Sequence, residues 1–149
     1  MSYDKIPNEL KILPQWVCSW DRSKCPMQAR QRKAASPIDP KTWCDYSTAA
    51  SAVESGMYDH IGFVFAENGI VGIDIDEEAP CFDEDNFLSL VGADIVGKCR
   101  SFTEKSKSGR GIHIYIRGDI PFSGRNKGKG VEIYKARRYF IITGNTLLF

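Results

Sequence analysis

Residues 111–117 have the sequence GIHIYIR, in which isoleucine alternates with histidine, tyrosine and arginine. Successive side chains of a strand point to opposite faces, so this period of two predicts a strand with His113 on the face opposite the isoleucines. Residues 73–76 have the sequence IDID, which alternates in the same way and places Asp74 and Asp76 together on one face. Each segment therefore presents an apolar face and a face of polar side chains.

The surrounding sequence predicts further helices and strands on both sides of these two segments. Helices are predicted over residues 6–13, 48–53 and 83–96, and strands over residues 15–20, 60–66, 70–75, 101–105, 131–134 and 138–143. The Asn68-Gly69 pair predicts a hairpin turn that joins 60–66 to 70–75 as partner strands. Residues 118–130 are basic and rich in glycine, which predicts a loop. Together these elements predict an α+β fold with a mostly antiparallel sheet and two or three helices.

The composition is that of a globular domain: the chain has 149 residues, of which 42% are hydrophobic and 26% are charged. No apolar run approaches the roughly 20 residues of a membrane helix, and residues 1–10 lack the apolar core of a signal peptide. Five cysteines form no CxxC pair, so we expect reduced thiols in a cytoplasmic protein without a membrane partner. A zinc site of Cys18, Cys25 and Cys44 has unfamiliar spacings, and buried unreactive cysteines are the preferred interpretation.

Charge is unevenly distributed along the chain, although the formal net charge is only +1. Residues 72–94 hold eight acids and no base, whereas residues 95–149 hold twelve bases and three acids. Local potential, and not net charge, attracts an anionic ligand or a divalent cation. Either the two segments form a cation site beside a phosphate site, or they are solvated surfaces that neutralise each other.

Carboxylates provide the first candidate site. Asp74 and Asp76 would lie roughly 7 Å apart along one strand face, where their mutual repulsion is best tolerated if a cation lies between them. Hard oxygen ligands of this kind suit Mg²⁺ or Mn²⁺. The alternative is a pair of solvated side chains at a strand end. Glu132 could add a third ligand if its strand lies beside that of Asp74, and otherwise it faces solvent and pairs with Lys129 or Lys135.

The segment from Ser106 to His113 provides the second candidate site. Its glycines allow the main chain to approach a ligand, and successive amides, two serine hydroxyls and nearby bases can form an anion nest. A histidine that follows directly can contact a phosphate oxygen or transfer a proton. The alternative is a hairpin turn with an incidental histidine.

Basic residues of the C-terminal segment provide a third signal, because they are interleaved with aromatic residues and could contact nucleic acid. Some of these aromatic residues belong to the core. The bases are Arg125, Lys127, Lys129, Lys135, Arg137 and Arg138.

Taken in order, these motifs resemble those of the archaeo-eukaryotic primase superfamily, and most closely the primase-polymerases of phages and plasmids. The resemblance runs from about residue 6 to residue 144 and rests on the combination, since each motif is weak alone. The matching segments are Leu13-Pro14-Gln15-Trp16-Val17, Asp74-x-Asp76, Ser106-x-Ser108-Gly109-x-Gly111-x-His113, Glu132 and Arg138-Tyr139-Phe140-x-x-Thr143-Gly144. Relatives often have aspartate at the third acidic position, where this chain has glutamate.

The resemblance implies an RRM-like, mostly antiparallel catalytic sheet with flanking helices and a small N-terminal α/β part. It implies catalytic roles for Asp74, Asp76, His113 and Glu132, and the three acids among them would bind Mg²⁺ or Mn²⁺. It also implies that the nucleotide phosphates contact His113 and a further set of residues, which are Ser106, Ser108, Gly109, Lys127 and Arg138.

The activity implied is template-dependent nucleotidyl transfer by a DNA primase and polymerase in phage or plasmid replication. Its substrates would be dNTPs or NTPs, on single-stranded or primer-template DNA, with a helicase domain or protein as partner. Residues 1–149 would form one catalytic domain, either alone or as the N-terminal part of a longer primase-helicase. Two alternatives are a non-catalytic module of the same fold that binds nucleic acid or protein, and a metal-dependent nuclease or phosphatase.

Overall fold

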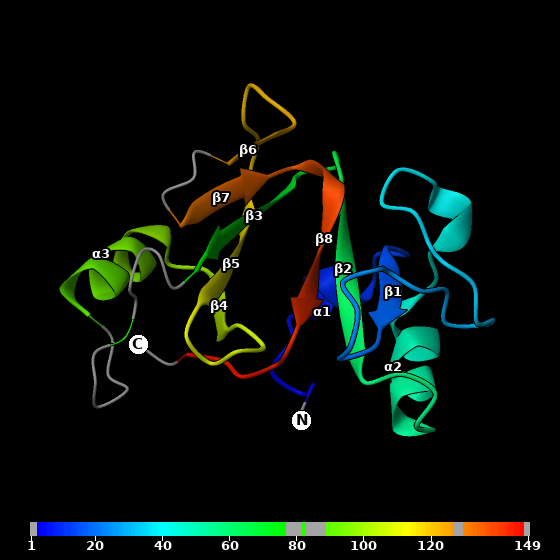
Figure 1. Ribbon diagram of the computed structural model, residues 1–149. Helices are drawn as coiled ribbons and strands as arrows, with labels where there is room; N and C mark the ends of the chain where they lie inside the picture. Colours follow the sequence, from blue (N-terminus) through cyan, green and yellow to red (C-terminus); the bar gives the residue numbers. More distant parts are fainter. Residues whose placement is uncertain (1–2, 77–81, 83–88, 127–129, 148–149) are drawn as a thin grey trace.

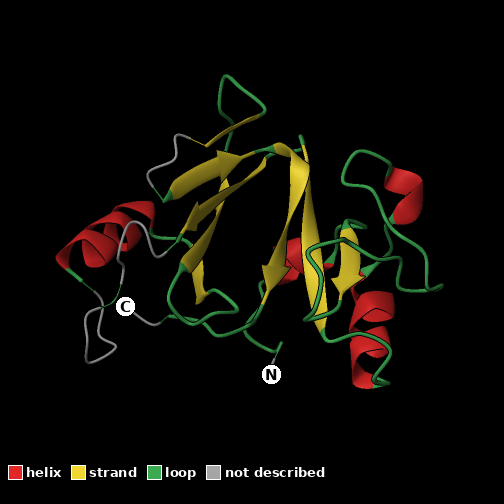
Figure 2. Ribbon diagram, viewed as in Figure 1, coloured by secondary structure: helices red, strands yellow, loops and turns green. Residues whose placement is uncertain are grey.

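Two antiparallel sheets and a few helices form the structure, a computed structural model that describes residues 3–76, 82, 89–126 and 130–147 (Figures 1 and 2). The first sheet has the order β1-β2-β8, with β1 over Trp16–Ser19, β2 over His60–Ala66 and β8 over Ala136–Ile142. The second has the order β4-β5-β3-β7-β6, with strands at Phe102–Lys105, Ile112–Arg117, Ile70–Ile75, Val131–Tyr134 and Gly124–Asn126. This confirms the predicted α+β class.

Each sheet has at least one helix packed beside it. Helices α1 (Asn8–Lys11) and α2 (Tyr46–Glu54) accompany the first sheet, together with a 3₁₀ turn at Pro40–Thr42. Asp45 caps α2 by accepting a hydrogen bond from the Thr48 amide, and the chain leaves this helix near Gly56, whose φ is +84°. No helix among the described residues is long and apolar enough to cross a membrane.

Helix α3 (Leu90–Cys99) packs on one face of the second sheet. Its Val96 joins a buried cluster with Ile75, Ile112 and Ile114, the apolar face predicted from the alternating sequences. The helix begins after Ser89, whose hydroxyl accepts a hydrogen bond from the Gly92 amide. The predicted helix over 83–96 thus has its second half confirmed, while residues 83–88 lie outside the described residues.

The predicted hairpin between residues 60–66 and 70–75 is wrong. Both edges of β2 are occupied by β1 and β8, and both edges of β3 are occupied by β5 and β7. The two strands instead pack face to face, because Gly72 of β3 has no side chain. A Cβ atom built on Gly72 would lie 2.2 Å from Cζ of Phe65 and 2.6 Å from Cε2 of Phe140. The turn at Asn68-Gly69 therefore leads from one sheet to the other.

Aromatic rings fill the space between the sheets. Phe65 contacts Phe63, Tyr115 and Phe140, with ring centroids 4.7–6.1 Å apart, and the Phe63, Phe65 and Tyr115 side chains are fully buried or nearly so. The second face of the β5 strand, which the sequence predicted as polar, therefore carries a core residue at Tyr115. One further prediction was wrong: residues 118–130 were expected to form only a loop, yet they contain the edge strand β6.

Candidate active site

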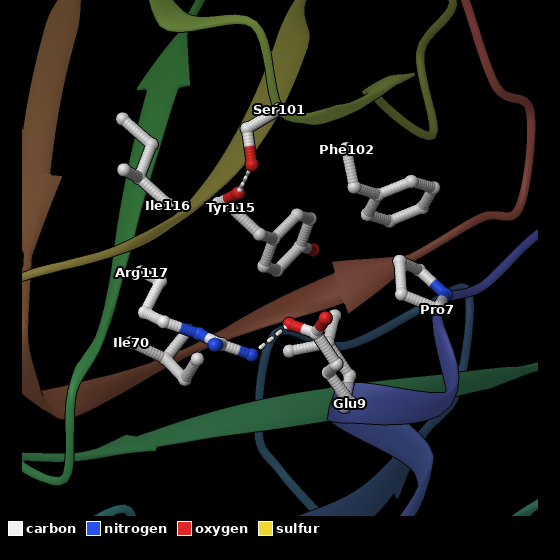
Figure 3. Close-up of a pocket in the computed structure, with 9 residues that line it drawn as sticks. Pro7, Glu9, Ile70, Ser101, Phe102, Tyr115, Ile116 and Arg117 are labelled. Atoms are coloured by element: carbon white, nitrogen blue, oxygen red, sulfur yellow. Dashed lines mark hydrogen bonds and ion pairs between the residues drawn. The ribbon is translucent and has the colours of Figure 1, made fainter.

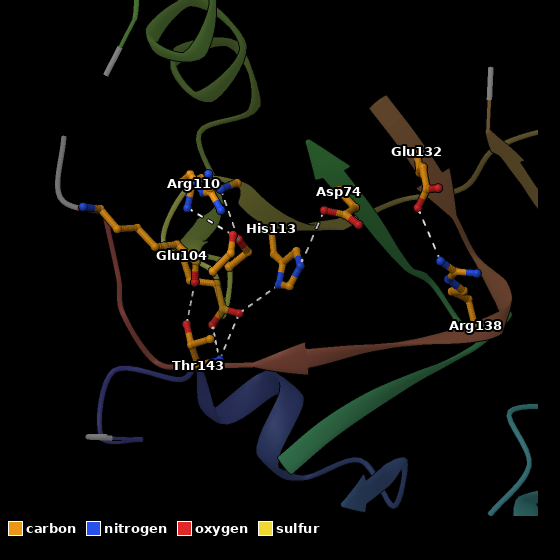
Figure 4. Close-up of polar contacts among 11 residues, drawn as sticks. Asp74, Glu104, Arg110, His113, Glu132, Arg138 and Thr143 are labelled. Atoms are coloured by element: carbon orange, nitrogen blue, oxygen red, sulfur yellow. Dashed lines mark hydrogen bonds and ion pairs between the residues drawn. The ribbon is translucent and has the colours of Figure 1, made fainter. Parts of the chain in front are cut away.

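Four neighbouring strands of the second sheet each place one polar residue in a single row across the sheet. Glu104 of β4 lies directly opposite His113 of β5, His113 lies opposite Asp74 of β3, and Asp74 lies opposite Glu132 of β7. Cross-strand partners project from the same face, so these four side chains share one surface (Figure 4). The condition set for Glu132, that its strand lie beside that of Asp74, is met. We refer to these four residues as the polar row.

The polar row lies beside the aromatic layer between the sheets, at the next same-face position along the strands. Gly72, two residues before Asp74 on the same face, is opposite Tyr115 and Tyr134 and lies under the aromatic rings of the first sheet. Exposure of the side chains increases from the edge of the sheet toward its centre: 0% for Glu104, 9% for His113 and 25% for Asp74, with 14% for Glu132. The row therefore opens to solvent around Asp74.

His113 is held on three sides. Its Nδ1 lies 3.2 Å from Oε2 of Glu104, and its Nε2 lies 3.6 Å from Oδ1 of Asp74. The imidazole ring also stacks on Phe140 of β8, with centroids 4.9 Å apart and an angle of 25° between the planes. These contacts fix the orientation of the ring and direct one nitrogen toward the open part of the row. These three contacts argue against the alternative in which His113 is an incidental residue after a hairpin turn.

Asp74 is the carboxylate whose ionisation the surroundings oppose. Burial raises the pKa of Asp74 above its usual value, and the nearby carboxylate of Asp76 raises it further. His113 and Arg138 act in the opposite direction and lower this pKa, without cancelling the effect. Asp76 follows β3 directly, is exposed, and is anchored by its amide, which donates to the Gly130 carbonyl oxygen at 2.8 Å.

The Glu132 side chain is only 14% exposed, so it is not the solvent-facing glutamate of that alternative. Arg138 of β8, in the first sheet, approaches it, with its guanidinium nitrogen 3.5 Å from Oε2 of Glu132. Lys135 instead pairs with Asp119 at 2.9 Å and with Glu67 at 3.4 Å. The other bases considered, Lys127 and Lys129, lie outside the described residues. Arg138 is thus the described base from the C-terminal segment that reaches the polar row.

The serine-glycine turn at residues 106–111 lies beside Asp76. A Cβ atom built on Gly111 would lie 2.6 Å from the Ile75 carbonyl oxygen and 3.5 Å from Cα of Asp76, so only glycine allows this approach. Within the turn, Oγ of Ser106 accepts from the Gly111 amide, Oγ of Ser108 accepts from the Arg110 amide, and φ of Gly109 is +77°. The turn is confirmed, whereas phosphate binding by its amides and hydroxyls stays a prediction.

The carboxylates match a magnesium or manganese site in chemistry and in the face they share. Asp74 and Glu132 stand side by side on paired strands, and Asp76 follows on the same strand as Asp74. In the structure Asp74 turns toward His113 and Glu132 turns toward Arg138. Accordingly, no three His, Cys, Asp or Glu side chains of the described residues already converge as metal ligands.

The cysteines do not support a zinc site among the described residues. Cys18 and Cys44 are buried, and their thiols donate to the main-chain oxygens of Ala49 and Trp16. Burial raises the pKa of the Cys18 thiol to about 12 and that of the Cys44 thiol to about 11. Both are the unreactive core residues that were expected, whereas Cys25 is exposed, which corrects the expectation of burial there.

No family model matches the sequence. The chain is 31% identical over 140 residues to the DNA primase-polymerase of Nitratiruptor phage NrS-1. This chain is related to a phage primase-polymerase. The alignment covers 87% of this chain and 19% of the phage protein, so the chain spans about a fifth of the length of this relative.

Glu104 is the member of the polar row that the sequence analysis missed. The predicted strand over residues 101–105 was correct, and alternation along it places Glu104 on the same face as Phe102. A single glutamate between threonine and lysine gives no sign of burial, and the opposite position of His113 depends on a register that only the folded sheet reveals. The Glu104 side chain is completely buried.

A cavity of about 200 Å³ lies outside the polar row (Figure 3). It is formed between α1 and strands β3, β4 and β5, and the Arg117 guanidinium at its side pairs with the carboxylate of Glu9. A second, more open cavity of about 400 Å³ is lined by residues that include Trp43 and Arg137. Neither lining includes a member of the polar row.

Proposed function

We propose that the chain is a template-dependent nucleotidyltransferase that acts as a DNA primase and DNA polymerase. The observation that carries this proposal is the polar row, which brings two carboxylates and a histidine from three adjacent strands onto one surface. The relationship to a phage primase-polymerase supports it independently. Residues 1–149 would act as one catalytic domain, and its sheet would belong to the RRM-like architecture of the archaeo-eukaryotic primase superfamily.

Asp74, Asp76 and Glu132 would hold Mg²⁺ or Mn²⁺. Their donor atoms are the hard oxygens that these ions prefer, and burial together with Asp76 disfavours an ionised Asp74 unless a cation is near. When held by these residues, such ions would supply activation of a 3′-hydroxyl and charge neutralisation at a leaving pyrophosphate. The protein contributes the fixed spacing of the carboxylates, since the paired strands β3 and β7 set the positions of Asp74 and Glu132.

The nucleotide triphosphate would lie across the open part of the polar row. His113 directs Nε2 to this side, and Arg138 brings a positive charge from the opposing sheet. Ser106, Ser108 and Gly109 would approach the phosphates from the turn beside Asp76, with Lys127 adding further charge. Basic groups that are held in place before the substrate arrives stabilise the developing charge of the transition state.

The wider setting follows from the same proposal. The substrates would be dNTPs or NTPs, and the template would be single-stranded or primer-template DNA. The role would be in phage or plasmid replication, with a helicase domain or protein acting on the same DNA.

Primer extension tests this function directly. A labelled primer-template is incubated with all four dNTPs or NTPs and with Mg²⁺ or Mn²⁺, using the wild type, Asp74→Asn and Asp76→Asn. Asp94→Asn is the matched control, because Asp94 is an exposed acid of α3 that pairs with Lys98. We expect metal-dependent extension by the wild type and the control, and losses of about 10³-fold in the two site variants, the scale seen when a principal source of transition-state stabilisation is removed.

Three results would contradict the proposal. Unchanged extension in both site variants would remove the carboxylates from the chemistry. Metal-dependent shortening of the primer would identify a nuclease. DNA binding that is equally tight without divalent ions, and without any extension, would indicate a non-catalytic binding module.

A further inference from the structure

Glu104 is a fully buried carboxylate at the hidden end of the polar row, and the mechanism proposed above gives it no task. Such a group is costly to bury unless its oxygen atoms receive hydrogen bonds. Its side chain lies at the junction of the two sheets, between β4, which carries it, and the residues that follow β8 (Figure 4). Its partners show what this carboxylate does.

Both oxygens of Glu104 accept hydrogen bonds from the main chain. The Thr143 amide lies 3.0 Å from Oε1 and 3.0 Å from Oε2, and the Gly144 amide lies 3.0 Å from Oε1. An amide N–H can only donate, so these contacts favour the ionised carboxylate, which can only accept. The third partner is Nδ1 of His113, at 3.2 Å from Oε2.

The contact with His113 has one consistent arrangement of protons. An ionised carboxylate has no proton to give, so Nδ1 of His113 must carry the proton of this hydrogen bond. The nitrogen on the other side of the ring, Nε2, is then the one that faces Asp74 and the open part of the row. In metal and catalytic sites, the hydrogen bond made by one ring nitrogen sets the state of the other.

We propose that Glu104 is the positioning residue of His113. It holds the proton on Nδ1 and presents Nε2 to the site, while the amides of Thr143 and Gly144 fix Glu104 itself. The consequence for the proton on His113 stands on the contacts alone. The consequence for catalysis rests on the proposed function, in which Nε2 contacts the nucleotide phosphates.

Substitution of Glu104 by glutamine reverses the arrangement without changing its shape. The glutamine has one carbonyl oxygen and one NH₂ group in place of two equivalent oxygens. The Oε1 position faces two main-chain donors, Thr143 and Gly144, whereas the Oε2 position faces only the Thr143 amide, so the carbonyl oxygen belongs at Oε1. The NH₂ group then faces Nδ1 of His113, which must accept a hydrogen bond and lose its proton. Glu104→Gln is therefore expected to move the proton of neutral His113 from Nδ1 to Nε2.

Two-bond ¹H–¹⁵N correlation spectra of protein with ¹⁵N-labelled histidine show which ring nitrogen carries the proton. The chain has two histidines, so His113→Asn assigns the signals and His60 serves as an internal reference. Spectra are recorded without divalent ions, from neutral to alkaline pH. We expect Nδ1–H at His113 in the wild type and in the exposed control variant Glu54→Gln, and Nε2–H in Glu104→Gln. His60 should be unchanged in all three.

The catalytic consequence is measured separately by primer extension. We expect Glu104→Gln to lower the rate of nucleotide addition about 10–100-fold, the usual effect of removing a partner that orients a ligand or catalytic group. Glu54→Gln should leave the rate unchanged. If the wild type shows no extension, the proposed function fails while the spectra still decide the role of Glu104.

The proposal is overturned if wild-type His113 carries its proton on Nε2 in the neutral form, a result that needs no variant. It is also overturned if folded Glu104→Gln keeps the wild-type pattern. Should Glu104→Gln fail to fold, as judged by its melting curve, the wild-type spectrum remains the deciding measurement.

Discussion

Gly72→Ala is the sharpest test of how the two sheets position the polar row. The added methyl group would lie 2.2 Å from Cζ of Phe65 and 2.6 Å from Cε2 of Phe140, whereas ordinary contact begins at 3.4 Å. The Phe65 ring cannot retreat easily, because it is fully buried and contacts Phe63, Tyr115 and Phe140. Overfilling a core in this way typically costs about 1–3 kcal/mol.

We therefore expect Gly72→Ala to lower the free energy of unfolding by about 2 kcal/mol, which corresponds to a Tm about 4–8 °C lower for a chain of this size. The comparison variant is Gly97→Ala in α3, where an added Cβ meets nothing within 4 Å. There the same change should stabilise the protein by about 1 kcal/mol, since alanine is the better helix former.

Thermal melting followed by circular dichroism, together with urea titration, measures both variants. A Gly72→Ala protein that melts at or above the wild-type temperature would refute the close packing of β3 on β2. Because Asp74 follows two residues later on the same face, this result would also remove the basis for placing the polar row at the edge of the aromatic layer.

Three further predictions concern the site and its surroundings. Burial raises the pKa of Asp74 above its usual value. The proton on Asp74 therefore contributes stability that is fully present when the pH is below the ordinary carboxyl pKa of about 3.9. This contribution is lost as the pH rises through the raised pKa of the folded protein. In thermal melts without divalent ions, Asp74→Asn should thus exceed the wild type in stability at neutral pH, with a difference that shrinks on acidification; equal melting at neutral pH would contradict this. Gly111→Ala would place Cβ 2.6 Å from a main-chain oxygen of β3. We therefore expect slower primer extension and a Tm that is lower by several degrees, at about 2–4 °C for each kcal/mol of lost stability. A variant with wild-type Tm and wild-type extension would disprove the close approach. In alkylation followed by mass spectrometry, Cys25 should be modified in the folded protein, whereas Cys18 and Cys44 should react only after denaturation.

The elements of the second sheet could be predicted because their signals are local. Alternation over residues 111–117 and 70–75 gave strands at the right positions, and the isolated Glu132 between apolar residues marked β7. The partners of the strands could not be predicted in the same way. Asn68-Gly69 has the composition of a tight hairpin turn, yet β2 and β3 do not pair. Their actual arrangement depends on the packing of Gly72 against Phe65 of β2 and Phe140 of β8, and Phe140 is distant in sequence.

In the candidate site, too, the residues with local sequence signals could be predicted, whereas the contacts between distant segments could not. Asp74, Asp76, His113 and Glu132 were chosen from short motifs, and the structure brings Asp74, His113 and Glu132 into one row while placing Asp76 just beyond it. Glu104 was missed because its role depends on a register between β4 and β5 and on amides that follow β8. A buried charge is recognised by its partners, and these are defined only by the folded chain.

The hydrogen bonds from Thr143 and Gly144 to Glu104 have a consequence for the order in which the molecule can form. During synthesis, the strands that carry Glu104, His113 and Asp74 leave the ribosome before residues 143 and 144 do. Until those two amides arrive, the Glu104 carboxylate lacks its main-chain donors, and β2 lacks its partner β8. Such pairings between distant segments form slowly, because the loop between them must close first. The surface proposed for catalysis is thus completed only after β8 and the two residues that follow it have been made.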